Sequence, residues 1–210
     1  VLSQMQPGTS KEFDMEVQPD GKVLIVGSST VISNQFSMLR LKTNGEPDST
    51  FGVNGKVFTV IDGTGEEAHS CFLQADGKIV LSGYTYTSDI NVLKLAVARY
   101  NPDGSPDNTF GSNGKATFNT GRLSELYELG LTGNGKYFGV GRCNGEILLT
   151  SINYNGTQDN SYGINGIMLY PGMPGEDIFR SVVILPDKKI LIAGYANNLG
   201  SDIALTRLYP

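Results

Sequence analysis

The chain has 210 residues, of which 16 are basic and 21 acidic, so its formal net charge is -5. This length supports one large domain or two small ones with a core that needs no disulfide or metal ion. The chain contains 27 glycines, no tryptophan and 18% charged residues, a composition that indicates many turns and excludes a disordered chain. Nucleic acid is not expected as a partner, because the sequence lacks the basic stripe that neutralises phosphates.

A membrane-spanning helix is also not expected. No apolar stretch approaches the ~18 residues that cross a bilayer, and no basic segment followed by an apolar one opens the chain. The sequence starts at Val1 rather than at a methionine, so removal of a signal peptide and an origin in a longer chain both stay open.

Two short motifs recur in the same order along the chain. The first is Asp-Gly-Lys, or a close variant, followed by apolar residues and a glycine, and it starts at Asp20, Asp76, Asn134 and Asp187, at offsets of 56, 58 and 53 residues. The second is a polar motif ending in Phe-Gly-x-Asn-Gly or a close variant, and it covers residues 44–55, 103–114 and 155–166. Two motifs that recur in register define an internal repeat.

Each repeat predicts four short strands, named a to d in chain order. In the second repeat, strand a ends at 72–73 before an Asp-Gly hairpin turn, strand b covers 79–82, strand c covers 93–100 and strand d covers 115–119. Residues 123–131 also carry apolar residues at helical spacing, but their register with strand a of the other repeats favours a strand. Four-stranded antiparallel units of about 50 to 60 residues without helices are typical of β-propeller blades.

The two ends of the chain predict how the blades close into a ring. At an offset of 56 residues, Val1 falls on Val57, so the chain begins at strand d, and residues 203–208 match strand c. This first strand, at residues 1–6, would then complete the last blade and remove the exposed strand edges. The rival interpretation is a piece of a longer array with two bare edges.

We therefore predict an all-β fold, a β-propeller with four blades of four antiparallel strands, closed by the N-terminal strand. It forms a single domain over residues 1–210. Its repeats cover about 20–75, 76–133, 134–186, and 187–210 together with 1–19.

These repeats resemble the delta-60 repeat family of bacterial β-propeller proteins. The resemblance rests on the motif at 76–83, the Ala-Arg-Tyr-Asn-Pro-Asp-Gly run at 98–104 and the Asp-Asn-Thr-Phe-Gly run at 107–111. This sequence departs from the pattern at Asn134, Ser151, Tyr162, Ile167 and Lys188. The resemblance implies a secreted or cell-surface protein of a Gram-negative bacterium, sometimes adhesive, and it implies no activity for the repeat.

The single histidine and the two cysteines do not predict catalysis. His69 and Cys71 point to the same side of a predicted strand, but no third group orients them, so we interpret both as packed residues. Cys143 lies beyond strand b of the next repeat, where a disulfide with Cys71 is not expected. No zinc-site spacing or Asp-x-Asp-x-Asp calcium loop occurs, and no cofactor is expected apart from the calcium alternative described below.

The repeated loop before strand d is interpreted as a structural element. Asp48 and Asp107 are expected to accept bonds from backbone amides in Asx turns, and Phe51 and Phe110 to fill the base of each blade. The a-b turns and c-d loops are nearly constant, whereas the d-a and b-c loops of the opposite end vary between repeats. Repeat proteins usually vary the loops that bind.

The variable b-c loops therefore supply the candidate ligand-binding residues. Tyrosine with asparagine and aspartate suits stacking on sugars or peptide segments and hydrogen bonding to them, and a merely solvated loop face is the alternative. The candidates are Tyr84, Tyr86, Asp89, Asn91, Arg142, Tyr195, Asn197 and Asn198.

A second candidate site is a ring of acidic residues at the start of strand a, near the predicted axis. Carboxylates around such an axis point into solvent, gain a basic partner such as Lys11, or bind a hard cation such as Ca²⁺. The candidate metal ligands are Glu66, Glu67, Glu125, Glu176 and Asp177.

Three functions follow from these observations. The first is a non-enzymatic binding or adhesive module that contacts a protein or glycan on a cell surface through the variable face. The second is a structural scaffold subunit, a component of a larger surface assembly. The third is a carboxylate-based glycan hydrolase or lyase, which would need two acids facing each other across a cleft.

Overall fold

The computed structural model describes residues 9–30, 34–62, 65–171, 178–197 and 201–208. Within these ranges the secondary structure consists of fifteen β-strands and no helix, which confirms the predicted all-β class. In the same ranges no helix is long and apolar enough to cross a membrane.

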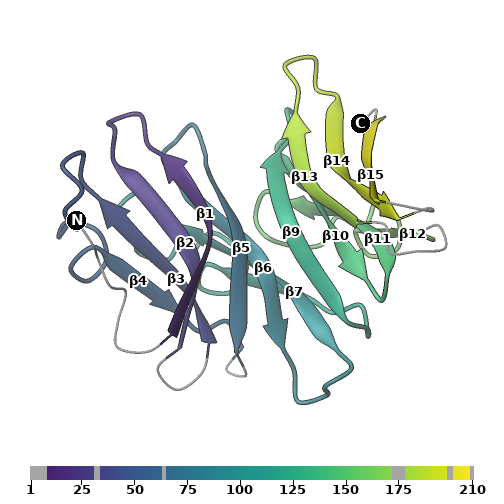
Figure 1. Ribbon diagram of the computed structural model, residues 1–210, viewed down its shortest axis with the longest axis horizontal. Coiled ribbons are helices and arrows are strands. Elements are labelled where there is room, and N and C mark those ends of the chain that lie inside the picture. The colour runs from purple at the N-terminus through teal and green to yellow at the C-terminus, as the bar shows by residue number, and fades with distance from the viewer. Residues whose placement is uncertain (1–8, 31–33, 63–64, 172–177, 198–200, 209–210) are drawn as a thin grey trace.

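The strands form four separate antiparallel sheets, one after another along the chain (Figure 1). Sheet 1 contains β1 (Thr9–Val17), β2 (Val23–Thr30), β3 (Asn34–Leu41) and β4 (Lys56–Thr59). Sheet 2 contains β5 (Glu66–Leu73), β6 (Ile79–Tyr86), β7 (Leu93–Tyr100) and β8 (Lys115–Phe118). Sheet 3 contains β9 (Ser124–Leu131), β10 (Lys136–Cys143), β11 (Glu146–Asn153) and β12 (Ile167–Tyr170). Sheet 4 contains β13 (Ile178–Ile184), β14 (Ile190–Asn197) and β15 (Ser201–Leu208).

The four sheets are offset from the four predicted repeats, because each sheet begins with a strand a that the predicted bounds assign to the preceding repeat; β5, for example, falls in the predicted repeat 20–75 but belongs to sheet 2. In each sheet the strands follow chain order, so β1, β5, β9 and β13 are the predicted a strands and form one edge of their sheets. The segment with helical spacing is the strand β9, as its register predicted. The hairpin glycine of the second repeat, Gly77, has the positive φ of 81° that its turn requires.

Each hydrophobic core lies between two successive sheets. Apolar residues on facing sides of sheets 1 and 2, of sheets 2 and 3, and of sheets 3 and 4 form three clusters of buried side chains. Representative residues are Leu24 and Leu81 in the first core, Phe110 and Tyr137 in the second, and Phe138 and Ile192 in the third. A sheet therefore depends on its neighbours for burial of its apolar faces.

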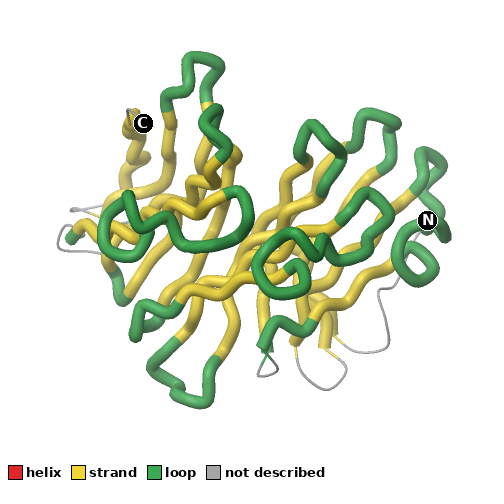
Figure 2. The backbone as a smooth tube through the Cα atoms, turned by 180° about the vertical axis from the view of Figure 1, so that it is seen from behind, coloured by secondary structure: helices red, strands yellow, loops and turns green. Residues whose placement is uncertain are grey.

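The loop between the third and fourth strands is structural, as predicted. Figure 2 shows these loops as green coils on the side seen from behind. In sheet 2 the Asp107 carboxylate accepts a bond from the backbone N–H of Thr109 at 3.0 Å, which is the predicted Asx turn. Asp48 accepts the equivalent bond from Thr50 at 3.1 Å, and the rings of Phe51 and Phe110 are fully buried.

A buried arginine joins each of the first two of these loops to the next sheet. Arg99 Nε lies 2.7 Å from Asp107 Oδ2, and its Nη1 donates to the backbone carbonyl of Tyr154 in sheet 3 at 2.7 Å. Arg40 makes the same pair of contacts in sheet 1, with Asp48 and with the carbonyl of Pro102 in sheet 2. Neither of these contacts was predicted from the sequence.

Each a strand contains a β-bulge close to its middle. The ladder register skips one residue at Phe13, His69, Tyr127 and Arg180. Opposite the bulge, strand b carries a glycine whose position brings the two backbones unusually close. A Cβ atom built on Gly141 would lie 2.0 Å from the carbonyl oxygen of Glu125. This contact explains the glycine that ends the first repeated motif.

Ring closure is not seen in the described residues. Sheet 4 has three described strands, and no strand of sheet 4 pairs with sheet 1 in this part of the chain. Residues 1–6, which were predicted to supply the missing strand, lie outside the described ranges. The prediction of closure therefore stays a prediction.

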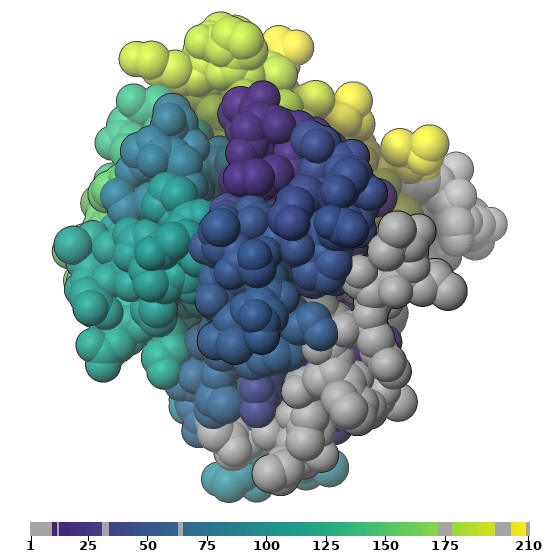
Figure 3. Space-filling view, turned by 90° about the vertical axis from the view of Figure 1, so that its left-hand side faces the viewer, coloured from purple at the N-terminus to yellow at the C-terminus, as the bar shows by residue number. Residues whose placement is uncertain are grey.

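Among the described residues, sheets 1 and 4 each present one apolar face without a neighbouring sheet, and Figure 3 views the molecule from the side of sheet 1. Met15 is 66% exposed, whereas Cys71, at the same position of sheet 2, is 7% exposed. In sheet 4, Leu205 is 64% exposed, whereas its counterpart Met38 in sheet 1 is fully buried. The exposed face of sheet 4 is equivalent to the face that sheet 1 turns toward sheet 2, and the exposed face of sheet 1 is equivalent to the face that sheet 2 turns toward sheet 1. Each of the three cores is made from one face of each kind.

The bulge predicts the effect of one substitution. Gly141→Ala should lower the free energy of unfolding by at least ~2 kcal/mol, because the new methyl group meets backbone rather than a movable side chain. Urea denaturation measures the change. Gly133→Ala is the matched control, since its Cβ would meet only the flexible side chain of Lys188 at 3.3 Å. Equal stability of the two variants would contradict the close approach.

Candidate functional site

The bulged residues of the four a strands contact one another in series. The rings of Phe13 and His69 have centroids 4.9 Å apart, and His69 is stacked on Tyr127 with centroids 5.5 Å apart and planes 9° apart. The Arg180 guanidinium lies 4.8 Å from the centroid of the Tyr127 ring. One side chain from each sheet therefore contributes to a continuous aromatic and cationic stack.

Glu67 lies beside this stack and is buried. Its Oε1 atom is 3.4 Å from Nζ of Lys11 and 3.5 Å from Nδ2 of Asn34, both from sheet 1. Its Oε2 atom is 3.9 Å from Nε2 of His69. The pKa of Glu67 lies below its ordinary value because the His69 ring, and then Lys11, favour the carboxylate against the effect of burial.

Glu125 occupies the equivalent position in sheet 3 and is also paired. Arg142 donates to its Oε1 atom at 2.8 Å, and the Tyr127 hydroxyl donates to its Oε2 atom at 2.9 Å. Between the two acids, the buried Tyr84 has its hydroxyl 3.3 Å from that of Tyr86. The pKa of Tyr84 is raised by burial, then by Tyr86 and by the charge of Glu67.

We call this group the axial cluster. It consists of Lys11, Phe13, Glu67, His69, Tyr84, Tyr86, Glu125, Tyr127, Arg142 and Arg180. Its carboxylates have cationic partners, and several of its rings are packed edge to face or stacked. Its exposed members are Lys11, Phe13, Tyr86 and Arg180. These four side chains are the most accessible of the cluster to another molecule.

A neighbouring acid differs from Glu67 in its charge environment. Glu128 follows the bulge in β9, and its Oε2 atom accepts a bond from the backbone N–H of Val182 in β13 at 2.7 Å. Asp14 accepts the N–H of Cys71 at 2.9 Å in the same way between β1 and β5. The pKa of Glu128 is raised, mainly because the side chain is buried and also because the charge of Asp14 lies nearby. Carboxylates therefore bridge two of the pairs of adjacent a strands.

The structure brings together five residues that the sequence analysis had placed in two separate sites. Glu67 and Glu125 were predicted metal ligands, and Tyr84, Tyr86 and Arg142 were predicted ligand-binding residues. One expectation was wrong: Tyr84 and Tyr86 lie in β6 and Arg142 lies in β10, not in b-c loops. Strand b continues for several residues past its glycine, because it pairs there with the start of strand a.

Tyr195 and Asn197 were also expected in a loop, and both lie in β14. Asp89 and Asn91 do lie in a loop, between β6 and β7, where the Asp89 carboxylate accepts the N–H of Asn91 at 2.9 Å. Asn198 lies outside the described ranges. In the described part of the chain, no hydrogen bond joins Tyr195, Asp89 or Asn91 to the axial cluster.

The predicted cation ligands do not all lie together in the described part of the chain, because Glu67 and Glu125 belong to the axial cluster and Glu66 does not. Glu66 is buried and accepts the backbone N–H groups of Ile61 and Asp62 at 3.2 Å, which orders the loop before β5. Glu176 and Asp177 lie outside the described ranges. Within those ranges, no three side chains of histidine, cysteine, aspartate or glutamate gather as metal ligands. The calcium alternative stays a prediction.

Sequence reasoning had treated His69 only as a packed residue and did not single out Phe13, Tyr127 and Arg180. A signal was present, since the repeat offsets of 56, 58 and 53 residues connect these four positions in turn. The bulge that turns them toward one another does not follow from the strand pattern.

Comparisons with known proteins agree with this architecture. The sequence model of a family described as "Domain of unknown function (DUF5122) beta-propeller" matches residues 18–51 and 74–110, which lie in sheets 1 and 2 and their loops. Among curated protein sequences, none matches the chain.

A solved structure of hydrazine synthase from Kuenenia stuttgartiensis is similar in fold, with a TM-score of 0.53 and 15% sequence identity. The likeness covers 98% of this chain and 30% of that chain. At this identity it concerns the fold alone. Together, the four antiparallel sheets and the family match over residues 18–51 and 74–110 indicate the β-propeller class of fold, and ring closure is not seen in the described residues.

Two acids of the inner strands should respond oppositely to substitution. Glu67→Gln should lower the free energy of unfolding at pH 7 by about 1 kcal/mol, because it removes a charge that lies beside Lys11 and contacts the His69 ring. Glu128→Gln should leave stability unchanged or raise it, because it removes a buried charge whose pKa is raised.

The two acids should also change the free energy of unfolding in opposite directions as the pH falls. The lowered pKa of Glu67 means that its contribution is present above the ordinary pKa of 4.5 and is lost as pH falls through the folded-state value. The raised pKa of Glu128 means that its cost disappears as pH falls below 4.5. Urea denaturation at pH 7 and at pH 3.5 measures both differences. The control is Glu46→Gln, because Glu46 forms an exposed ion pair with Lys42. A larger loss at pH 3.5 for Glu67→Gln would contradict the assignment.

Proposed function

We propose that this β-propeller is a non-enzymatic binding or adhesive module of an exported bacterial cell-surface protein. It contacts a protein or a glycan through the end of the molecule that carries the b-c loops and the axial cluster. The observation that carries the proposal is the contrast between the two ends of the sheets. The resemblance to delta-60 repeat proteins supports the secreted or cell-surface location in a Gram-negative bacterium.

One end of the sheets repeats the same contacts three times. Asp48, Asp107 and Asp159 each accept an N–H from the residue two positions later, at 3.0 to 3.1 Å. The N–H of Gly52 donates to the carbonyl of Asp103 in the next sheet, and that of Gly111 to Asn155. Loops that hold neighbouring sheets together in this way are scaffold, and they have little freedom to adapt to a ligand.

The opposite end differs from sheet to sheet. There the equivalent bulge positions carry phenylalanine, histidine, tyrosine and arginine, and Tyr86 and Lys11 add exposed aromatic and cationic groups. Rigid aromatic side chains next to fixed charges suit stacking and directional hydrogen bonding, which are the contacts that sugars and peptides make. The buried members of the axial cluster hold the exposed ones in place.

The charge state of the acids supports binding over hydrolysis. A glycan hydrolase needs one carboxylic acid with a raised pKa as proton donor and a second carboxylate opposite to it. In the axial cluster the pKa of Glu67 is lowered, and Glu125 is held by Arg142 at 2.8 Å. Such ion-paired carboxylates suit a structural or recognition role better than proton donation.

Tyr86 offers the cleanest test, because it is 38% exposed. Screening the protein on glycan and cell-surface protein arrays should identify a ligand, and Tyr86→Ala should weaken its binding at least tenfold. The loss of an exposed ring should change the free energy of unfolding by only ~0.5 kcal/mol. Ile164→Ala, in the constant loop of sheet 3, is the control and should bind like the parent protein.

Two outcomes would contradict the proposal. Undiminished binding by Tyr86→Ala together with weakened binding by Ile164→Ala would move the site to the constant end. Turnover of any arrayed glycan by the parent protein would replace a binding module with an enzyme. Tyr84→Ala is not a suitable probe, since Tyr84 is buried and its truncation would leave a cavity.

The exposed apolar faces of sheets 1 and 4 allow two arrangements: ring closure within one chain, or a structural scaffold in which these faces hold another chain. We propose that the exposed face of sheet 4 packs on the exposed face of sheet 1 within one chain, with residues 1–6 completing sheet 4. The fit is supported by the repeat, because Leu205 and Met15 stand where Met38 and Cys71 meet in the first core. A scaffold subunit would instead use the same two faces to hold another chain.

Charged substitutions separate these arrangements. If the ring closes within one chain, Leu205→Asp should lower the free energy of unfolding by ~2 kcal/mol or more, and the parent protein should be monomeric by light scattering. An oligomeric parent that Leu205→Asp dissociates would support the scaffold. Ile90→Asp, at a loop residue that is 88% exposed, is the control. No effect of Leu205→Asp on stability or mass would contradict both.

A further inference from the structure

The third sheet lacks an arginine that the first two sheets bury. Arg40 is paired with Leu24 in its ladder and Arg99 with Val80, whereas the same position opposite Phe138 is Ser151. In the first two sheets the arginine fills the space between its own strand and the next sheet's loop. Serine is too short to do so.

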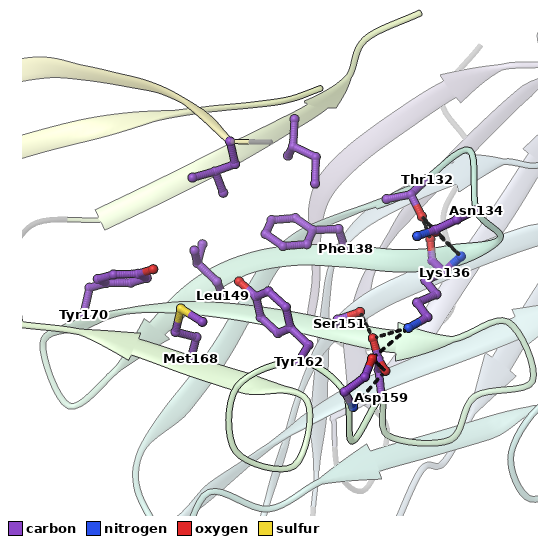
Figure 4. A pocket seen from close by; sticks show the side chains of 13 residues that line it. Thr132, Asn134, Lys136, Phe138, Leu149, Ser151, Asp159, Tyr162, Met168 and Tyr170 are labelled. Atoms are coloured by element: carbon purple, nitrogen blue, oxygen red, sulfur yellow. Dashed lines mark hydrogen bonds and ion pairs between the residues drawn. The ribbon is translucent and has the colours of Figure 1, made fainter. Parts of the chain in front are cut away.

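A cavity of about 440 Å³ opens beside Ser151, between sheets 3 and 4. Figure 4 shows its aromatic and apolar wall, which includes Phe138, Tyr162, Met168 and Tyr170, and its polar end at Asp159. Tyr162 stands where Phe51 and Phe110 stand in the other sheets, and burial raises its pKa to about 12. The cavity therefore joins a flat aromatic surface to a buried carboxylate.

The charges around that carboxylate also differ between the sheets. Asp48 has both Arg40 at 2.9 Å and Lys22 at 3.4 Å as cationic partners. Asp107 likewise has Arg99 at 2.7 Å and Lys78 at 4.0 Å.

In sheet 3, the cation on Asp159 is Lys136, at 2.8 Å, and the Ser151 hydroxyl donates to it at 2.7 Å. Burial opposes ionisation of Asp159, but bonds from Lys136, Ser161 and Ser151 outweigh it and hold its pKa well below the ordinary value. The carboxylate is therefore charged at neutral pH. Among the described residues it has one cationic partner, where its counterparts have two.

We propose that this cavity binds an alkylguanidinium group, supplied by a ligand, in the place of the missing arginine. The planar cation lies against the Tyr162 ring, as Arg40 lies over Phe51 with its central carbon 4.3 Å from the ring centroid. Its positive charge lies beside the Asp159 carboxylate, and its aliphatic stem contacts Phe138, Leu149 and Ile190. This site is at the opposite end of the sheets from the axial cluster and does not depend on the function proposed above.

Calorimetric titration with butylguanidinium tests the site, and butylurea, which has the same shape without the charge, is the matched probe. Butylguanidinium should bind with one site per chain and at least tenfold more tightly than butylurea. Ser151→Arg should abolish this binding and raise the melting temperature by a few degrees, because the tethered arginine occupies the cavity. Equal binding of both probes, no saturable binding of butylguanidinium, or unchanged binding to Ser151→Arg would overturn the proposal.

A converse variant keeps the test decisive if Ser151→Arg does not fold. Arg99→Ser creates the same vacancy in sheet 2, so butylguanidinium should raise its melting temperature more than that of the parent protein. An equal rise in both proteins would overturn the proposal. A Gly-Arg-Gly peptide distinguishes the source of the group: tighter binding than butylguanidinium indicates an arginine side chain of a protein, and weaker binding indicates a small molecule.

Discussion

Every hydrophobic core in this protein is shared by two sheets, and the other features depend on that sharing. A single layer of four short strands has apolar residues on both faces and cannot bury either face alone. The exposed fractions show the effect directly, since Met15 in the terminal sheet is 66% exposed and Cys71, at the same position one sheet later, is 7% exposed. The contacts of Arg40 and Arg99 cross from one sheet to the next and fix how the two layers meet.

The strands and loops were predictable because their signals are local. The Asp-Gly turns, the Asx turns at Asp48 and Asp107 and the buried rings of Phe51 and Phe110 each depend on a few adjacent residues. Their recurrence at regular offsets also identified β9 as a strand against its helical spacing. What the sequence did not show was which face of each sheet has a neighbour, because that depends on the arrangement of whole sheets.

The candidate site was predicted in parts and not as a whole. Glu67 and Glu125 were recognised as acids at the start of strand a, and Tyr84 and Arg142 as residues past the glycine of strand b. Their proximity follows from the hairpin register, in which Glu67 pairs with Tyr84 and Glu125 with Arg142. The stack through His69 depends on a bulge, which changes the register by one residue and redirects the side chain.

The shared cores also give the molecule an uneven resistance to opening. Sheets 2 and 3 each contribute to two cores, whereas among the described residues sheets 1 and 4 each contribute to one. As long as the outer faces of sheets 1 and 4 do not pack on each other, backbone amides in β6 and β10 should exchange with solvent deuterium most slowly, and those in β1 and β15 most rapidly. Opening would then proceed from the terminal sheets inward, and the carboxylate bridges from Asp14 and Glu128 would be among the first long-range contacts to break.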